Sequence, residues 1–313
     1  MILLIRYTLL FATVLMTVAL GGCISEHSGV INLGLEGIMV MGAMGGALAM
    51  QGMAENTPVI AAILVVIIVS GLSGMIYSVL LAVASINLRA DQTLIGIAMN
   101  MLAAALATII VRTINMSVDP SNVSSTVQYG MIKKLLVFNI GSLQISCLSV
   151  FSLLLLAAVY FMFSKTVFGL WLMACGEHPQ AADSVGINVT KMRWSGVLIS
   201  GFFGGLGGIM YITAGVSEWK FETGVAGFGF LALAVMIFGQ WKPLNIALAA
   251  LLFGFFRALS NVYTGFDFLA SLNIPSVFYD MLPYIISLIV LVFTSKNSHA
   301  PKAEGIPYDK GMR

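Results

Sequence analysis

Apolar runs about as long as a lipid bilayer is thick recur along this chain of 313 residues. A helix needs about 20 such residues to cross the hydrocarbon core. We place the runs at residues 2–23, 30–53, 58–85, 93–114, 145–164, 194–215, 225–240, 244–263 and 277–295. The run at 225–240 is short, and Asn32, Gly34, Glu36 and Gly37 interrupt the second run. The pattern predicts an all-α polytopic membrane protein with about eight to ten spans, nine being the best count, and a discontinuous second span.

Composition agrees with a chain whose main solvent is lipid. Hydrophobic residues make up 59% and charged residues 9% of the sequence, with a mean hydropathy of +1.00. A water-soluble core could not bury that much apolar surface. The net charge of +2 is small and scattered, so we expect no nucleic-acid partner. Cys23, Cys147 and Cys175 have no metal-ligand or pairing pattern, and we expect no metal and no cofactor in this chain.

The first run has a second interpretation. It carries a lone Arg6 and ends in "LGGC", which resembles a lipoprotein signal that ends at Cys23. Because further apolar runs follow, whereas the mature part of a lipoprotein is usually soluble, a first membrane helix is favoured.

Between the runs there is no room for a soluble domain, and only 115–144 forms a long polar loop. We therefore expect one transmembrane domain over 1–296, with a cytoplasmic loop at 165–193 and a short cytoplasmic tail at 297–313. Placing the 165–193 loop inside leaves most of the 15 Lys and Arg residues on the cytoplasmic side, as the positive-inside rule requires. With nine spans the N-terminus is then outside.

Polar groups inside apolar runs are expensive and often functional. Glu36 is the only carboxylate in its run, and Asn32 would share its face if the segment is helical there. We predict that Asn32, Glu36 and Asn100 line a translocation path. The alternative for Glu36 is a position at the headgroup boundary or hydrogen bonds from a neighbouring helix, and for Asn100 a hydrogen bond between helices.

Glycine spacing adds two expectations. Gly201/Gly205 and Gly204/Gly208 form small-xxx-small patterns that let helix backbones approach closely, either within one subunit or between subunits. Gly29-Val30 with Gly34 recurs as Gly224-Val225 with Gly229, in segments that would run in opposite directions. This is the pattern of an inverted repeat around a midplane site.

One polar stretch, "GEHPQAADSVGI", lies between two spans. Pro179 suits the first position of a helix and Gly186 suits its end. A helix of two turns is unstable alone in water, so we expect it to dock on a partner. Ala181, Ala182 and Val185 would form its small contact face. The alternative is a solvated loop that happens to be helical.

The sequence lacks several motifs that are typical of enzymes. It contains no G-x-x-x-x-G-K-[ST] loop, so we expect no ATP hydrolysis by this chain. It also contains no H-E-x-x-H motif and no nucleophile–base pattern, and we expect that the chain is not an enzyme.

Three segments together resemble the permease subunits of bacterial ABC importers for nucleosides, of the branched-chain amino acid and ribose permease superfamily. They are "ISEHSGVINLGLEGIMVMGAMGG", "GEHPQAADSVGINVTKMRWSGVLISGFFGGLGGIMY" and "GFGFLALAVMIFGQWKPLNIALAALLFG", and the tail "APKAEGIPYDKGMR" fits as well. The chain is most similar to the shorter of two permeases that pair in such systems. Cys23 and His27 depart from the pattern, where an apolar residue and an arginine would be expected.

The resemblance implies an importer of the bacterial inner membrane with a second permease, two cytoplasmic ATPases and an extracytoplasmic substrate-binding lipoprotein. ATP would be hydrolysed by the partner. The coupling helix would span Gly176 to Asn188, and the residues expected at the ATPase are Gly176, Glu177, His178, Pro179, Ala181, Ala182, Val185 and Gly186. An ion-coupled secondary transporter, and an importer of the same superfamily for branched-chain amino acids or sugars, remain alternatives.

Overall fold

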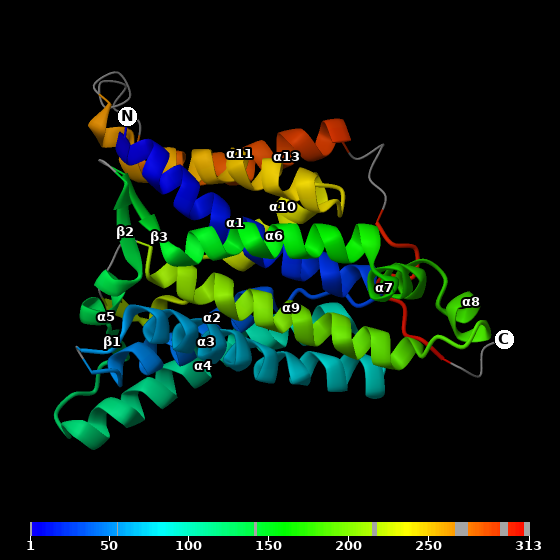
Figure 1. The fold of residues 1–313 in the computed structure, drawn as a ribbon, viewed down its shortest axis with the longest axis horizontal. Helices are drawn as coiled ribbons and strands as arrows, with labels where there is room; N and C mark the ends of the chain where they lie inside the picture. The colour runs from blue at the N-terminus through cyan, green and yellow to red at the C-terminus, as the bar shows by residue number, and fades with distance from the viewer. Residues whose placement is uncertain are drawn as a thin grey trace.

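The computed structural model describes residues 2–54, 56–140, 143–214, 218–266, 275–294 and 300–309. The long helices, shown in Figure 1, are α1 (Ile2–His27), α3 (Val59–Ala82), α4 (Gln92–Val118), α6 (Cys147–Lys165), α9 (Val189–Ile212), α11 (Pro243–Val262) and α13 (Ser276–Thr294). Two shorter apolar helices are α2 (Leu35–Gln51) and α10 (Phe228–Phe238). A π-helical turn, Val83–Asn87, continues α3.

Six helices in the described residues are long and apolar enough to cross a membrane: α1, α3 with its π turn, α4, α6, α9, and α11 with the 3-10 turn that follows it. This confirms an all-α polytopic membrane protein. Helix α1 continues through Cys23, which is buried. The expected break in the second span is also present, because α2 begins only at Leu35 and residues 28–34 are not helical.

Side-chain caps begin several helices at the points where the chain turns. The side chains of Asp91, Ser146, Thr166 and Asn188 each accept a hydrogen bond from a backbone N–H in the first turn of the helix that follows. Such caps satisfy donors that a helix leaves unpaired at its N-terminus.

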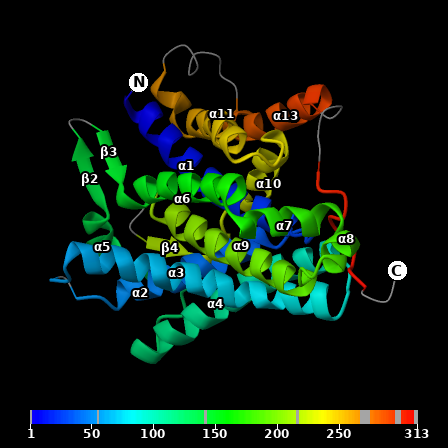
Figure 2. The same ribbon diagram turned by 45° about the vertical axis from the view of Figure 1, so that its right-hand side comes forward.

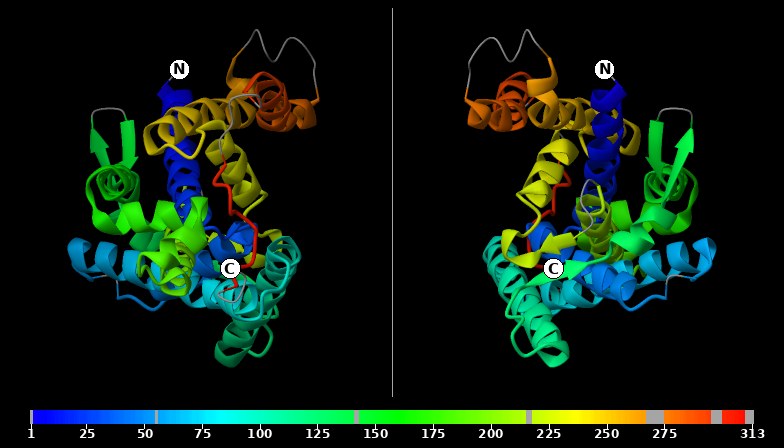
Figure 3. Two further views of the ribbon diagram at one scale, coloured as in Figure 1. Left: turned by 90° about the vertical axis from the view of Figure 1, so that its right-hand side faces the viewer. Right: turned by 90° about the vertical axis from the view of Figure 1, so that its left-hand side faces the viewer.

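Helix α9 lies at the centre of the packing. Seen along the long axis, α2, α3 and α4 form one side of the molecule and α10, α11 and α13 the other, with α1 between them (Figure 3). A Cβ on Gly205 would overlap the backbone of α3, and a Cβ on Gly208 would overlap the carbonyl of Met39 on α2. The small-xxx-small faces therefore join helices within this chain, as the first of the two sequence interpretations proposed.

Small elements cover one end of the bundle, which we call the β end. They are β1 (Thr126–Gln128), α5 (Gly130–Leu135), β2 (Val137–Ile140), β3 (Leu143–Ser146) and β4 (Glu218–Lys220). Strand β1 pairs with β4, with Thr126 opposite Lys220, and β2 pairs with β3 as an antiparallel ribbon. The segment 115–144 is therefore not a plain polar loop, because α4 extends to Val118 and most of the rest folds against the bundle.

The opposite end, which we call the α8 end, carries α7 (Val167–Glu177), α8 (Pro179–Ser184) and the described part of the C-terminal tail (Figure 2). Residues 300–309, here called the C-terminal strap, run back over this end. The Ala303 N–H donates to the carbonyl of Gly176 at 2.8 Å, and the Gly305 N–H to that of Gly29 at 3.3 Å. The strap thus connects the end of α7 to the turn between α1 and α2.

Candidate functional site: a helix junction and a short exposed helix

Two interrupted helices meet N-terminus to N-terminus inside the bundle. The Glu36 carboxylate, in the first turn of α2, accepts hydrogen bonds from the N–H of Gly227 at 2.8 Å and of Gly229 at 2.6 Å. These two glycines begin α10, so Glu36 supplies the acceptor that this helix N-terminus needs. A Cβ at position 229 would overlap the backbone of Glu36, which explains the glycine there. We call this contact the helix junction.

The two halves of the junction follow the predicted internal similarity. Gly29 and Gly224 both have a positive φ, of 92° and 60°, and the valine after each is fully buried. Helix α2 ends at Gln51, which lines a cavity at the β end together with Glu218, whereas α10 leads to Trp241, which donates a hydrogen bond to Glu26 at the α8 end. The two short helices therefore run in opposite directions from the junction.

Asn100 closes the same junction from α4. Its Oδ1 accepts a hydrogen bond from the N–H of Gly37 at 2.8 Å, and its Nδ2 donates to the carbonyl of Leu33 at 2.9 Å. The side chain replaces backbone bonds that the break before α2 leaves unmade. This geometry is the interhelix hydrogen bond that the sequence offered as the alternative, and a role of Asn100 in a translocation path stays a prediction.

Asn32 lies near the junction but not on the face expected for it. Because residues 28–34 are not helical, Asn32 and Glu36 do not share one side of a helix. Asn32 is fully buried and its Nδ2 donates to Ser200 Oγ on α9 at 2.9 Å. Its Oδ1 has no hydrogen-bond partner among the described residues.

Helix α8 begins at Pro179, as expected, and ends in a Schellman motif. The Ile187 N–H donates to the carbonyl of Ala182 and the Gly186 N–H to that of Asp183, with Gly186 at a φ of 90°. This arrangement satisfies the last carbonyls of a helix and brings the residue after the glycine onto the helix side. The predicted helix and its stop are present, although part of the polar stretch, up to Glu177, belongs to α7.

The three residues expected on the contact face of α8 do not lie on one side of the helix. Ala182 is 3% exposed and packs with Cys175 and Val189, so it faces the permease itself. Val185, by contrast, is 76% exposed, and Gln180, Ala181 and Ser184 are exposed with it. The expectation that Ala182 faces a partner with Ala181 and Val185 was wrong, because the Schellman turn folds Ile187 over Ala182.

The other predicted coupling residues take different positions. Gly176 and Pro179 are buried, and a Cβ on Gly176 would overlap the carbonyl of His27. Glu177, His178 and Gly186 are exposed. The surface that a partner could reach therefore consists of the outer side of α8 and its two ends.

Sequence reasoning missed the partners of Cys23 and His27, the two residues that depart from the family pattern. Both contact the carbonyl of Trp241, at 3.2 Å from Cys23 Sγ and 3.1 Å from His27 Nε2. The Trp241 indole N–H donates to Glu26 at 2.5 Å. The sequence contains no signal for these contacts, because Gln240 and Trp241 form the turn after α10 with positive φ values that their residue types do not indicate.

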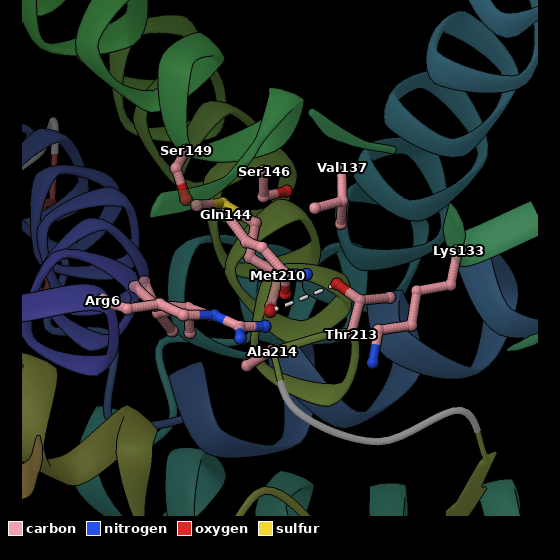
Figure 4. A pocket seen from close by; sticks show the side chains of 11 residues that line it. Arg6, Lys133, Val137, Gln144, Ser146, Ser149, Met210, Thr213 and Ala214 are labelled. Carbon is pink, nitrogen blue, oxygen red and sulfur yellow. Dashed lines mark hydrogen bonds between the residues drawn. The ribbon is translucent and has the colours of Figure 1, made fainter. Parts of the chain in front are cut away.

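A small cavity at the β end gathers positive charge (Figure 4). Arg6 and Lys133 line it together with Gln144, Ser146 and Thr213. Burial, and secondarily the Arg6 charge, lowers the pKa of Lys133. The cavity measures about 30 Å³, which is room for a water molecule but not for an organic substrate. Among the described residues no group of three or more His, Cys, Asp or Glu side chains could hold a metal.

A sequence model of the family described as "Branched-chain amino acid transport system / permease component" matches residues 4–294. The chain belongs to this permease family. It is 38% identical to the guanosine ABC transporter permease protein NupQ of Bacillus subtilis, over 98% of this chain and 96% of that protein. It is 37% identical to the nucleoside ABC transporter permease protein NupC of Lactococcus lactis, over 96% and 95%. These relatives are transport permeases.

The fold is similar to a solved structure of a metal-chelate type ABC transporter in an inward-facing conformation. The TM-score is 0.50 at 14% identity, and the match covers 92% of this chain and 85% of that chain. This likeness concerns the arrangement of helices alone. Together with its apolar helices, family membership makes the chain a multi-pass membrane protein.

Proposed function

We propose that this chain is the membrane-spanning permease subunit of an ATP-driven importer for nucleosides in a bacterial cell membrane. The observation that carries the proposal is its similarity, over nearly the whole length of each chain, to permeases named for guanosine and for nucleosides. The ATPase is a separate polypeptide, and the importer also holds a second permease, making a heterodimer, and an extracytoplasmic substrate-binding lipoprotein.

Coupling to the ATPase runs through α8. Support comes from Val185, a large apolar side chain that is 76% exposed in a short, otherwise polar helix. A single exposed apolar side chain is common on protein surfaces, so the support lies in the place of Val185 on the short helix between α7 and α9, where a partner would cover it. The buried side of α8 packs on Cys175 of α7 and Val189 of α9. A displacement of α8 by the ATPase would therefore also displace these two helices.

Movement of α7 and α9 would then reach the helix junction. Helix α9 packs on α2, where a Cβ on Gly208 would overlap the Met39 carbonyl, and Asn32 binds Ser200 of α9. Packed interfaces of this kind shift between discrete arrangements rather than deforming gradually. ATP-driven closure of the ATPases would thus switch the junction between outward-open and inward-open states.

The test is uptake of labelled guanosine in cells that lack their own nucleoside importers and express the assembled transporter. We expect that uptake requires both this chain and an ATPase able to hydrolyse ATP. We also expect that unlabelled uridine reduces the uptake of labelled guanosine by competition. Uptake that continues with a catalytically dead ATPase would instead indicate an ion-coupled transporter. Competition by leucine or ribose, with none by nucleosides, would contradict the substrate class.

A further inference from the structure

The β end contains a cavity of about 270 Å³ whose walls are mainly aromatic. Its lining includes Tyr7 and Phe11 of α1, Tyr211 of α9, Trp219 of β4, and Arg257 and Asn261 of α11. The volume is close to the lower limit of ordinary ligand sites. This aromatic cavity is nine times as large as the cavity at Arg6 (270 against 30 Å³) and can hold one small organic molecule.

The rings come as two ordered pairs on different elements. Tyr7 and Phe11 are stacked, with centroids 5.9 Å apart, and Tyr211 and Trp219 meet edge to face at 5.5 Å. Phe228 joins the two pairs, because its ring lies 5.5 Å from that of Phe11 and 4.3 Å from that of Tyr211. Rings held in place in this way offer flat faces on which a heteroaromatic base can stack. Purines and pyrimidines can both do so, because every base has a π-face.

The charged side chain and the amide side chain of the lining, Arg257 and Asn261, both belong to α11. The Arg257 guanidinium lies 5.6 Å above the Phe228 ring and hydrogen-bonds the Tyr211 hydroxyl, which fixes both rings in place. Asn261, one turn further along α11, is exposed and offers an amide donor and acceptor. The described lining residues include no carboxylate.

The cavity adjoins the helix junction. Phe228 is the first residue of α10, directly between Gly227 and Gly229, whose N–H groups bind Glu36. The Trp219 indole N–H donates to the carbonyl of Gly224 at 3.0 Å, in the turn that precedes α10. A molecule held against these rings would therefore rest next to the point where the two short helices meet.

We propose that the aromatic cavity is a recognition site for nucleosides on the permease itself, in which the base stacks on Trp219 with the Tyr211 ring at its edge and the ribose faces Asn261. This inference rests on the proposed function, because it places the first permease contact of the imported nucleoside in this cavity. It goes further in naming the base as the recognised part of the substrate.

The test is equilibrium binding of labelled guanosine to the purified importer in lipid nanodiscs, without the substrate-binding lipoprotein. Stacking on an aromatic side chain suggests that Trp219→Ala weakens binding about tenfold or more. Trp219→Phe keeps a ring face and should bind within a few-fold of the wild type. Tyr160→Leu, which removes an exposed tyrosine of α6 outside the cavity, is the matched control and should bind normally. Ribose should not compete.

Equal guanosine binding by Trp219→Ala and the wild type would overturn the site, as would competition by ribose as strong as by guanosine. Guanosine uptake by cells that express the wild-type importer is measured in parallel. Normal uptake together with unchanged binding in Trp219→Ala rejects the cavity and leaves the proposed function standing. Absence of both uptake and binding in the wild type rejects both proposals.

Discussion

The helix junction and helix α8 differ in how side chains that contrast with their surroundings are satisfied. At the junction, polar side chains in apolar surroundings use their hydrogen bonds within the chain: Glu36 binds two backbone N–H groups and Asn100 binds one N–H and one carbonyl. On α8, an apolar side chain in polar surroundings, Val185, contacts little of its own chain. The first pattern is that of a structural joint, and the second is a surface that the proposed ATPase contact would cover.

This difference separates stability from coupling. Substitutions at the junction should unfold or loosen the permease, because an unsatisfied polar group in a membrane interior costs several kcal/mol. Substitutions on the outer side of α8 should leave the permease folded and change only its partnership.

The largest effect is expected for Glu36→Ala. It leaves the N–H groups of Gly227 and Gly229 without their acceptor, and we expect a loss of about 3 kcal/mol or more of stability. Glu36→Gln keeps one acceptor oxygen and should therefore lose less stability than Glu36→Ala. Thermal unfolding in detergent measures both, and Glu218→Ala, at an exposed position of β4, is the control. If Glu36→Ala unfolded at the wild-type temperature, Glu36 would not be holding α10 in place.

A smaller effect is expected for Asn100→Leu, which keeps much of the volume and removes both hydrogen bonds. The loss should be about 1–3 kcal/mol, because the Gly37 N–H and the Leu33 carbonyl lose their partner. Asn100→Asp retains the acceptor for the Gly37 N–H and should therefore lose less stability than Asn100→Leu. The matched control is Ala105→Leu on the exposed side of α4. Equal unfolding temperatures for Asn100→Leu and Ala105→Leu would show that these bonds contribute nothing.

The C-terminal strap should respond weakly to pH. Burial raises the pKa of Glu304 from about 4.5 to about 7, and its carboxyl hydrogen-bonds Glu26. Because the docked pKa is the higher one, docking is strongest while Glu304 is protonated, weakens as pH rises from about 4.5 to about 7, and changes little above that. Amide exchange at Ala303 and Gly305, corrected for its intrinsic pH dependence, should therefore be faster at pH 8 than at pH 6.

Glu304→Gln supplies the control for that measurement, because its side chain stays neutral at both pH values. Its strap should change its exchange rate between pH 6 and 8 by less than the wild-type strap does. A wild-type strap whose exchange changes no more than that of Glu304→Gln would mean that the Glu304 carboxyl does not govern docking.

The sequence was sufficient for the membrane helices and for the break before α2, because run length and the interruption by Asn32 and Gly34 are local signals. It could not supply the partner of Glu36. Those donors are backbone N–H groups that lie 191 and 193 residues further along the chain, and any non-proline residue carries such a group. The repeated Gly-Val pairs were the one trace of the junction, and both glycines proved to need a positive φ.

On α8 the limit was different. Ala181 and Ala182 are identical in chemistry, so residue type cannot say which one faces inward. The Schellman motif decides it, because Ile187 folds over Ala182 and leaves Ala181 exposed. The bonds of the C-terminal strap were equally hidden, since the contacts of Ala303 and Gly305 are again made by backbone groups.

The most direct measurement of the central claim is capture of the ATPase by Val185→Asp in membranes that hold both proteins. A charge on the outer side of α8 should abolish most of the capture, since burying it unpaired at the contact is unfavourable. The amount of permease should stay normal, because surface substitutions usually change stability by less than about 0.5 kcal/mol. Val118→Asp, at a similarly exposed valine at the end of α4, should capture the ATPase normally. Full capture by Val185→Asp would contradict the account.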